Sequence, residues 1–262
     1  MSPQGDVGAR DLLRVENLHL AFGGLKALDG VRFGVPEGKL SSLIGPNGAG
    51  KTTLFNAVSG LLKLHSGEVL FDGHPLQHLV PEQITAFGLV RTFQIARGFP
   101  KLTVFEHLML YGQQQPGEQF WKALLGSRAA ADREAELAER AWAIARQLKL
   151  DHVIDNRVTA LSGGQKKLLE IGRALMARPR MILFDEPAAG VNPTLAEAIG
   201  DHLQAIVQGG VTVLIIEHDM ALIGRISEHV IVMAQGQTLA EGSFDVVRND
   251  PAVQDAYFGV RK

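Results

Sequence analysis

A run of eight residues near the N-terminus has the pattern of a phosphate-binding loop, G-x-x-x-x-G-K-[ST]. The run consists of Gly45, Pro46, Asn47, Gly48, Ala49, Gly50, Lys51 and Thr52. Its glycines let the backbone curl so that several N–H groups point at one anion, and a helix that begins at the end of the run adds positive charge there. Lys51 would reach the terminal phosphates of a nucleotide, the Thr52 hydroxyl would bind Mg²⁺, and Thr53 is included among the predicted phosphate contacts. By itself the run predicts a nucleotide-binding protein, a class that includes kinases, GTPases and helicases.

Two acidic residues follow a short apolar run in the second half of the chain. Residues 181–184 are predicted to form a buried strand, and Asp185 and Glu186 come directly after it. Asp185 would hold Mg²⁺, usually through water, while Glu186 would polarise the water that attacks the terminal phosphate. An apolar strand that ends in two acids is common by itself. Combined with the phosphate-binding loop, it favours a nucleotide-hydrolysing site.

A five-residue string shortly before these acids narrows the class of protein. It reads Leu161-Ser162-Gly163-Gly164-Gln165 and is predicted to open a helix, whose start is a second place for an anion. With this string the chain resembles the nucleotide-binding domain of an ABC transporter, from about Leu13 to the C-terminus. The resemblance implies ATP and Mg²⁺ as cofactors. It also implies a head-to-tail dimer, in which ATP on one subunit meets four residues of the other: Ser162, Gly163, Gly164 and Gln165.

The same resemblance gives roles to three residues outside these motifs. Phe22 matches the aromatic residue that stacks on adenine, and His218 matches the switch histidine near the γ-phosphate. Gln94 matches the glutamine that contacts Mg²⁺ and the attacking water. The predicted catalytic residues are Glu186, His218, Gln94 and Lys51. The predicted metal ligands are Thr52, Gln94 and Asp185.

Two positions depart from the usual pattern of this family. Asn192 stands in the loop after Glu186 where an aspartate is common, so it keeps a hydrogen-bonding role across the dimer without the charge. The helix after Gln165 continues with Lys-Lys-Leu at residues 166–168, where many relatives carry glutamine and arginine. No role is assigned to those three residues.

Further strings indicate one branch of the family. They are residues 22–28 (FGGLKAL), 90–94 (VRTFQ), 187–193 (PAAGVNP), 217–220 (EHDM) and the C-terminal segment 249–259. Together they resemble the larger ATPase of bacterial high-affinity branched-chain amino acid importers. The resemblance implies import of a branched-chain amino acid or a related small polar solute. The implied partners are a second ATPase subunit, two membrane permease subunits and, indirectly, a periplasmic or surface solute-binding protein.

Three other functions stay open from the sequence. The ATPase of a lipopolysaccharide-export ABC transporter has similar loops, although the Tyr-Phe-Gly tail at residues 257–259 is the weak point of that match. A soluble ABC ATPase acting on DNA or ribosomes usually carries two ATPase units or a long coiled coil, and this chain has one unit and no heptad array. A P-loop kinase would need an acceptor site and has no reason to contain the string at residues 161–165.

The segment from Gln94 to about Leu110 is the predicted permease-docking surface. It follows the predicted γ-phosphate sensor and carries more apolar groups than a plain surface needs. With the residue before it, its large apolar side chains are Phe93, Ile95, Phe99 and Phe105. The alternative is that these side chains pack the inside of a helical insert.

The elements that must position these motifs alternate along the chain. Strands are predicted at residues 13–20, 27–35, 40–44, 67–73, 181–184 and 211–216, and helices at 51–62, 103–111, 129–150, 162–177 and 194–207. The alternation predicts an α/β fold with a mostly parallel core sheet. A helical insert lies at about residues 95–160, with an apolar stripe of Leu137, Ala141, Ile144 and Leu148.

The resemblance completes the expected architecture as a P-loop NTPase of the ABC ATPase type, with an N-terminal antiparallel β subdomain. The predicted domains are a flexible tail at residues 1–11 and an ABC ATPase domain at 12–262, whose C-terminal family tail begins at about residue 243.

Composition and charge exclude several other classes. The net charge of −2 gives no reason to expect nucleic-acid binding, and the absence of cysteine excludes disulfides and thiolate metal sites. No run approaches the roughly 20 apolar residues that span a bilayer, and residues 1–10 lack the apolar core of a signal peptide. These absences predict a soluble protein whose membrane role would come through a partner. The resemblance to ABC importers then implies a place on the cytoplasmic face of the inner (plasma) membrane, held there by permease partners.

Overall fold

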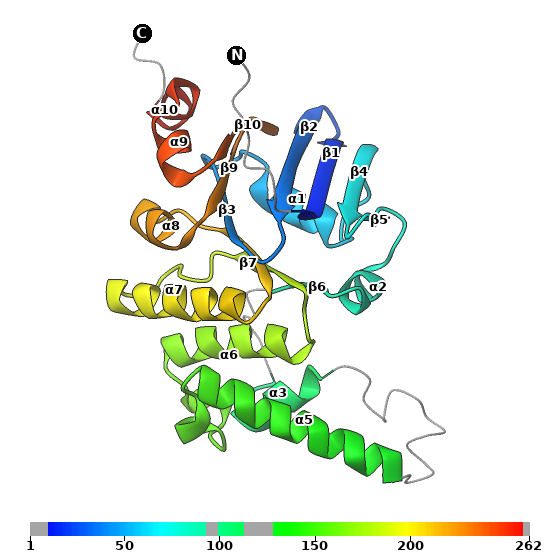
Figure 1. Cartoon of the computed structure of the whole chain (residues 1–262), viewed down its shortest axis with the longest axis vertical. Helices are drawn as coiled ribbons and strands as arrows, with labels where there is room; N and C mark the ends of the chain where they lie inside the picture. Colours follow the sequence, from blue (N-terminus) through cyan, green and yellow to red (C-terminus); the bar gives the residue numbers. More distant parts are fainter. Residues whose placement is uncertain (1–9, 93–98, 113–127, 259–262) are drawn as a thin grey trace. The chain divides into compact units, whose positions relative to one another are not determined.

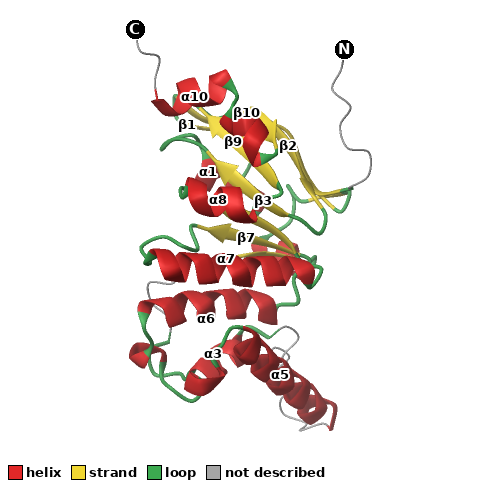
Figure 2. Ribbon diagram, turned by 60° about the vertical axis from the view of Figure 1, so that its left-hand side comes forward, coloured by secondary structure: helices red, strands yellow, loops and turns green. Residues whose placement is uncertain are grey.

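The computed structural model describes residues 10–92, 99–112 and 128–258. The chain divides into two compact units: a sheet unit, Met1–Arg91 with Arg180–Lys262, and a helical unit, Thr92–Pro179. The helical insert predicted at about residues 95–160 falls within the helical unit. Figures 1 and 2 show the elements of each unit.

The sheet unit begins with a four-stranded antiparallel sheet in the order β2-β1-β4-β5. Its strands are β1 (Asp11–Phe22), β2 (Leu25–Pro36), β4 (Ser66–Phe71) and β5 (His74–Pro75). β1 and β2 form a hairpin in which Phe22 pairs with Leu25, and Gly23 in the turn has φ +59°, which glycine adopts without strain. This sheet confirms the expected antiparallel β subdomain. Phe22 is the last residue of β1 and lies next to the hairpin turn.

The second sheet of this unit has the order β10-β9-β3-β8-β7-β6. Its strands are β3 (Leu40–Ile44), β6 (Leu89–Arg91), β7 (Met181–Asp185), β8 (Thr212–Ile216), β9 (His229–Ala234) and β10 (Gln237–Gly242). β9, β3, β8, β7 and β6 run parallel, and only β10 pairs antiparallel among these described strands. Every side chain of β3 and β8 is buried, as expected for central parallel strands covered on both faces. The mostly parallel core sheet is confirmed.

The helices of the sheet unit are α1 (Lys51–Val58), α2 (Pro81–Ala86), α7 (Pro193–Gln208), α8 (Met220–Ile226), α9 (Phe244–Arg248) and α10 (Pro251–Phe258). One core cluster joins the antiparallel sheet, α1 and the core sheet through side chains such as Val15, Phe55 and Leu43. α1 ends at Val58, four residues before the predicted end at residue 62, because Gly60 has φ +75° and cannot continue a right-handed helix.

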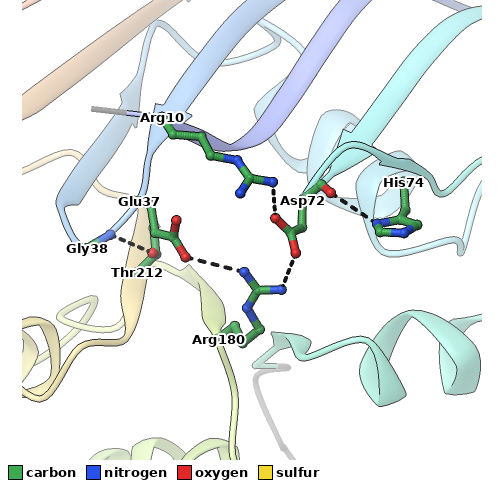
Figure 3. Close-up of polar contacts among 7 residues, drawn as sticks. All are labelled: Arg10, Glu37, Gly38, Asp72, His74, Arg180 and Thr212. Carbon is green, nitrogen blue, oxygen red and sulfur yellow. Dashed lines mark hydrogen bonds and ion pairs between the residues drawn. The ribbon is translucent and has the colours of Figure 1, made fainter. Parts of the chain in front are cut away.

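A charged network lies at the amino ends of the parallel strands (Figure 3). Arg180, directly before β7, places Nη1 2.6 Å from Oδ2 of Asp72 and Nη2 3.3 Å from Oε1 of Glu37. Arg10 also pairs with Asp72. The hydrogen bond from Arg180 lowers the pKa of the Asp72 carboxyl, and the same bond raises the pKa of Arg180. Because Asp72 and Glu37 follow strands of the antiparallel sheet, the network ties that sheet to the start of β7.

The helical unit is built from α3 (Val104–Leu110), α5 (Arg128–Gln147) and α6 (Gly163–Met176), with two short 3₁₀ turns, η2 (Asp151–Val153) and η3 (Val158–Ala160). The three helices pack against one another in pairs. All four residues of the predicted apolar stripe are buried: Leu137, Ala141, Ile144 and Leu148. Gly172 of α6 lets the helices approach closely, since a Cβ there would lie 3.0 Å from side-chain carbons of both Leu108 and Leu148. No helix among the described residues is long and apolar enough to cross a membrane.

Candidate active site

The predicted phosphate-binding loop joins the carboxyl end of β3 to the start of α1. Gly45 has φ +150°, and a Cβ at this position would lie 2.0 Å from the carbonyl oxygen of Met233. Gly50 has φ +99°, and a Cβ there would lie 2.6 Å from the carbonyl oxygen of Ala27. Both positions therefore require glycine, because any side chain would collide with backbone. The loop leads into the N-terminus of α1, where backbone N–H groups attract anions.

Lys51 is folded back onto the loop that precedes it. Its Nζ donates to the carbonyl oxygens of Gly45 at 2.7 Å and Pro46 at 3.1 Å, and the residue is only 7% exposed. Burial lowers the pKa of the Lys51 ammonium, and the carboxylates of Glu186 and Asp185 act against that shift. A cation held by two neutral carbonyls inside an anion-binding loop can exchange those carbonyls for a phosphate at little electrostatic cost.

Asp185 is the last residue of β7 and is bound by an arginine that the sequence analysis did not single out. Nη2 of Arg91 lies 3.1 Å from Oδ2 of Asp185, and the Arg91 side chain is 6% exposed. Nη1 of Arg91 donates to Oδ1 of Asn56 at 2.5 Å and to Oγ of Ser59 at 3.3 Å. Burial lowers the pKa of Arg91, and the Asp185 carboxylate opposes that shift. Arg91 thus fixes the orientation of Asp185 and ties it to α1.

Glu186 and His218 form a pair at the carboxyl ends of β7 and β8. Nε2 of His218 lies 2.6 Å from Oε1 of Glu186, and both side chains are partly exposed. Glu186 has φ +51°, which is rare for a residue with a side chain, and its N–H donates to the carbonyl oxygen of Ile216 at 3.0 Å. This left-handed turn aims the carboxylate out of the sheet edge toward the imidazole.

The buried carboxylate of Glu217 accepts two backbone hydrogen bonds next to this pair. Oε1 of Glu217 accepts from the N–H of Ala188 at 2.8 Å, and Oε2 accepts from the N–H of His218 at 3.2 Å. Glu217 is 4% exposed; burial raises the pKa of its carboxyl, while the two N–H groups act against that shift. It joins the loop after Glu186 to the end of β8. The only sequence signal for this role is a glutamate next to His218.

A cleft of about 400 Å³ brings most of the predicted site residues together, and this volume is within the usual range for ligand pockets. Its lining consists of Phe22, Leu25, Lys26, Ala27, Asn47, Gly48, Ala49, Gly50, Lys51, Thr52, Thr53, Glu186 and His218. Phe22 is 51% exposed, so it is not a core residue of the sheet. The lining therefore combines an exposed aromatic ring with an anion-binding loop.

Gly45 and Pro46 belong to the same loop, and Asp185 directly precedes Glu186. Gln94, together with Phe93 and Ile95, lies outside the described residues. The string at residues 161–165 belongs to the helical unit, where Ser162 caps α6. Oγ of Ser162 accepts from the N–H of Gln165 at 3.2 Å, and Oε1 of Gln165 accepts from the N–H of Ser162 at 2.9 Å, a reciprocal capping box.

Asn192 also caps a helix. Its Oδ1 accepts from the N–H of Leu195 at 2.9 Å at the start of α7, in the sheet unit. Asparagine is among the preferred residues for this position, so the departure from aspartate keeps the cap.

Comparison with known proteins identifies the family. The model described as "ABC transporter" matches residues 28–189, and the relatives given below match nearly the whole chain. The chain belongs to the ABC transporter family. A second model, described as "Branched-chain amino acid ATP-binding cassette transporter", matches residues 237–262, which include α9 and α10.

Relatives and a solved structure agree with this assignment. A Methanocaldococcus jannaschii protein named probable branched-chain amino acid transport ATP-binding protein LivG is 42% identical, covering 95% of this chain and 98% of the relative. A Pseudomonas aeruginosa protein named high-affinity branched-chain amino acid transport ATP-binding protein BraF is 39% identical, covering 96% and 99%. A crystal structure of the ADP conformation of an ATP-binding cassette of an ABC transporter has a TM-score of 0.84 and 41% identity, covering 95% of this chain and 99% of that one.

Proposed function

We propose that this chain is the ATP-binding and ATP-hydrolysing subunit of an ABC transporter that imports branched-chain amino acids or a related small polar solute through partner permeases. The observation that carries the proposal is one cleft that combines the phosphate-binding loop with the Glu186–His218 pair. The match at residues 237–262 and the names of the relatives support the choice of solute.

In the proposed complex ATP occupies this cleft with its adenine stacked on Phe22. The exposed ring of Phe22 supports this placement, since aromatic rings stack favourably on bases. The N–H groups of the loop and the start of α1 bind the phosphates. Lys51 exchanges the carbonyls of Gly45 and Pro46 for the terminal phosphates, which neutralises charge without moving the backbone.

The residues beside the loop suit Mg²⁺. The Thr52 hydroxyl and the Asp185 carboxylate offer oxygen donors, and Mg²⁺ in nucleotide sites is usually held by one or two carboxylates together with phosphates. When bound, Mg²⁺ supplies positive charge that stabilises the phosphate oxygens during transfer. Arg91 keeps the Asp185 carboxylate oriented for this role. Gln94 is the third proposed ligand of Mg²⁺, on the basis of the family resemblance.

Hydrolysis is assigned to the pair at the ends of β7 and β8. Glu186 accepts a proton from the attacking water, and the imidazole of His218 donates a hydrogen bond to the same carboxylate. Glu217 holds the backbone N–H of His218, so the imidazole stays beside the γ-phosphate end of the cleft.

A second subunit completes the proposed nucleotide site. The capped start of α6, with Ser162, Gly163, Gly164 and Gln165, contacts ATP on the partner subunit. A Cβ on Gly163 would have no atom within 4 Å, so the fold itself does not require glycine there and the backbone is open to a ligand. Binding of ATP closes the dimer and hydrolysis opens it, which is how one nucleotide drives a permease.

The permease-docking surface is proposed on the segment from Gln94 to about Leu110. Among its described residues, Phe99 is 59% exposed and Leu110 is 45% exposed, so both side chains are accessible to a partner. Phe105 is half-buried, with its ring centroid 6.5 Å from that of Trp142, and contributes less to such a surface. Two membrane permeases would hold the chain at the cytoplasmic face of the inner membrane, and a periplasmic or surface binding protein would deliver the solute.

The test uses the Glu186→Gln variant in cells that lack the native copy. We expect ATP hydrolysis by the purified transporter to fall at least about 100-fold, with ATP binding retained, because the proton acceptor is lost while the phosphate loop is intact. Uptake of labelled leucine should stop. The control is Glu197→Gln, the same chemical change on an exposed position of α7, which should behave as wild type.

The outcomes separate the two parts of the proposal. Wild-type hydrolysis in Glu186→Gln would show that Glu186 is not the base. Lost hydrolysis with normal leucine uptake would leave the ATPase in place and overturn the branched-chain assignment.

A further inference from the structure

Among the residues that the structure describes, Glu217 is the only acidic residue that is buried. It directly follows β8 and precedes His218 in the chain. Its two carboxylate oxygens accept from different segments: Oε1 from the N–H of Ala188 at 2.8 Å, and Oε2 from the N–H of His218 at 3.2 Å. A single carboxylate therefore connects the two loops that leave the neighbouring parallel strands β7 and β8.

The β7–α7 loop begins at Glu186 and is attached to the end of β8 at two points. The N–H of Glu186 donates to the carbonyl oxygen of Ile216 at 3.0 Å, and the N–H of Ala188 donates to Glu217. Gly190, two residues further along, is exposed, and a Cβ at this position would have no atom within 4 Å. The first half of the loop is thus tied to β8, while its tip is open.

The hydrogen bonds of Glu217 do not offset the cost of burying its charge. Burial raises the pKa of its carboxyl, the two backbone N–H groups act against that shift, and the charge of Glu186 adds to it. A carboxyl whose pKa is raised by folding stabilises the fold when it is protonated, and its ionised form costs stability. A neutral side chain of the same shape would therefore suit the fold better. The charge has to be explained by something other than stability.

The two segments that Glu217 connects carry the pair assigned to hydrolysis. Nε2 of His218 lies 2.6 Å from Oε1 of Glu186, and both residues line the nucleotide cleft. Glu217 binds the N–H of His218 and the N–H of Ala188, which is two residues after Glu186. Because one side chain holds both backbones, a displacement of the β7–α7 loop changes the position of the imidazole as well as that of the catalytic carboxylate.

We propose that Glu217 is a positioning residue that couples the β7–α7 loop to His218, so that the conformation of this loop controls the rate of ATP hydrolysis. The inference rests on the proposed function, because it concerns the Glu186–His218 pair. Glu217 is not part of the lining of the cleft and acts through the backbone of its two partners. Its carboxylate offers an acceptor oxygen to each N–H group at once, whereas an amide of the same shape has one acceptor oxygen and one donor group.

The first experiment compares Glu217→Gln with Glu228→Gln in the full chain. Glu217→Gln removes the charge and leaves one acceptor oxygen for two N–H groups. Glu228→Gln makes the same chemical change at an exposed position just before β9. Three quantities are measured for each variant: kcat for ATP hydrolysis, KM for ATP, and Tm.

For Glu217→Gln we expect kcat to fall about tenfold, the size of one hydrogen bond to a charged group, with KM within about twofold of wild type. KM is retained because the phosphate-binding loop and Phe22 are unchanged. Tm should equal or exceed that of wild type, since a buried charge is removed. Glu228→Gln should match wild type in all three quantities.

Gly190→Ala tests whether the loop and the histidine are coupled. Gly190 has φ +74°, where alanine is strained, but the added Cβ meets no atom, so the variant disturbs only the loop backbone. In the otherwise wild-type chain we expect this strain to lower kcat about two- to fivefold. In a chain that already carries Glu217→Gln the same substitution should add little further loss, because the link between the loop and His218 is already broken.

An unchanged kcat in Glu217→Gln would overturn the inference. A Tm that falls together with kcat would also overturn it, because Glu217 would then be a structural residue only. Losses that multiply in the double variant, or an unchanged kcat in Gly190→Ala, would show that the loop and the histidine are independent. None of these results affects the proposed function, which depends on the loss of hydrolysis and leucine uptake in Glu186→Gln.

Discussion

The two ends of the parallel strands in the sheet unit carry charged groups that are used in opposite ways. At the amino ends, Arg180 is paired directly with Asp72 and Glu37, in contact with solvent. At the carboxyl ends, Lys51 is 7% exposed and donates to the neutral carbonyl oxygens of Gly45 and Pro46, while Glu186 faces a partly exposed histidine. The first set is satisfied by opposite charge within the protein. Lys51 and His218 have partners that a charged ligand can replace, whereas Asp185 at the same ends is paired with Arg91. The replaceable partners are what distinguish a binding site from a structural network.

The largest effect is expected for Lys51→Ala, at the carboxyl ends of the strands. It removes the cation at the carboxyl end, and we expect nucleotide affinity to fall about 10- to 100-fold, the range for a hydrogen bond to a charged group. Calorimetric titration with ATP measures the change. The control is Lys63→Ala, an exposed lysine in the loop after α1, which should bind ATP as wild type does. Equal loss in both variants would contradict a local role for Lys51.

Arg91→Ala tests the Arg91–Asp185 ion pair, which contributes to stability and also orients a predicted site residue. It leaves Asp185 without its arginine and Asn56 and Ser59 without their donor, so we expect a loss of roughly 2–4 kcal/mol in the free energy of unfolding. Denaturant unfolding measures this value. Arg91→Lys keeps the charge without the planar fork and should recover only part of it. Full stability in Arg91→Ala would show that the pair contributes nothing net.

Asp72→Asn is the smallest expected effect and tests the amino-end network. Its pKa is lowered by the hydrogen bond from Arg180, so the ionised form is favoured in the folded state. The stabilisation is present above the unfolded pKa of about 3.9 and is lost as pH falls through the lower folded pKa. We therefore expect the variant to have a lower Tm than wild type at pH 7, with the two values converging as the pH falls through the folded pKa of Asp72. Nucleotide affinity at pH 7 should be unchanged, and a drop in affinity would mean that the two ends are not independent.

Much of the architecture follows from local sequence. The buried strand at residues 40–44 is bounded as predicted, because a central parallel strand is a continuous apolar run that ends at a glycine loop. The apolar stripe from Leu137 to Leu148 is buried as predicted, because its 3.6-residue period defines one helix face. The resemblance to ABC transporters rested on short strings, and the family match confirms it.

The contacts between distant residues were not predictable in the same way. Arg91 meets Asp185 because β6 and β7 are parallel neighbours with Arg91 opposite Leu183, a register that no local pattern shows. Glu217 accepts from two backbone N–H groups, which leave no trace in side-chain composition. The roles of Phe22, Gln94 and His218 came from resemblance and stay predictions. The structure adds that Phe22 and His218 line the same cleft.

The left-handed backbone of Glu186 creates a conflict between selection for stability and selection for ATP hydrolysis. A residue with a side chain at φ +51° carries strain of the order of 1–3 kcal/mol, which glycine at the same position would largely remove. Glycine would also remove the carboxylate on which the proposed hydrolysis depends. A lineage selected only for stability would drift toward glycine there, whereas a lineage that must hydrolyse ATP would tolerate the strain. The identity of residue 186 in any descendant of this chain is therefore a record of which demand has prevailed.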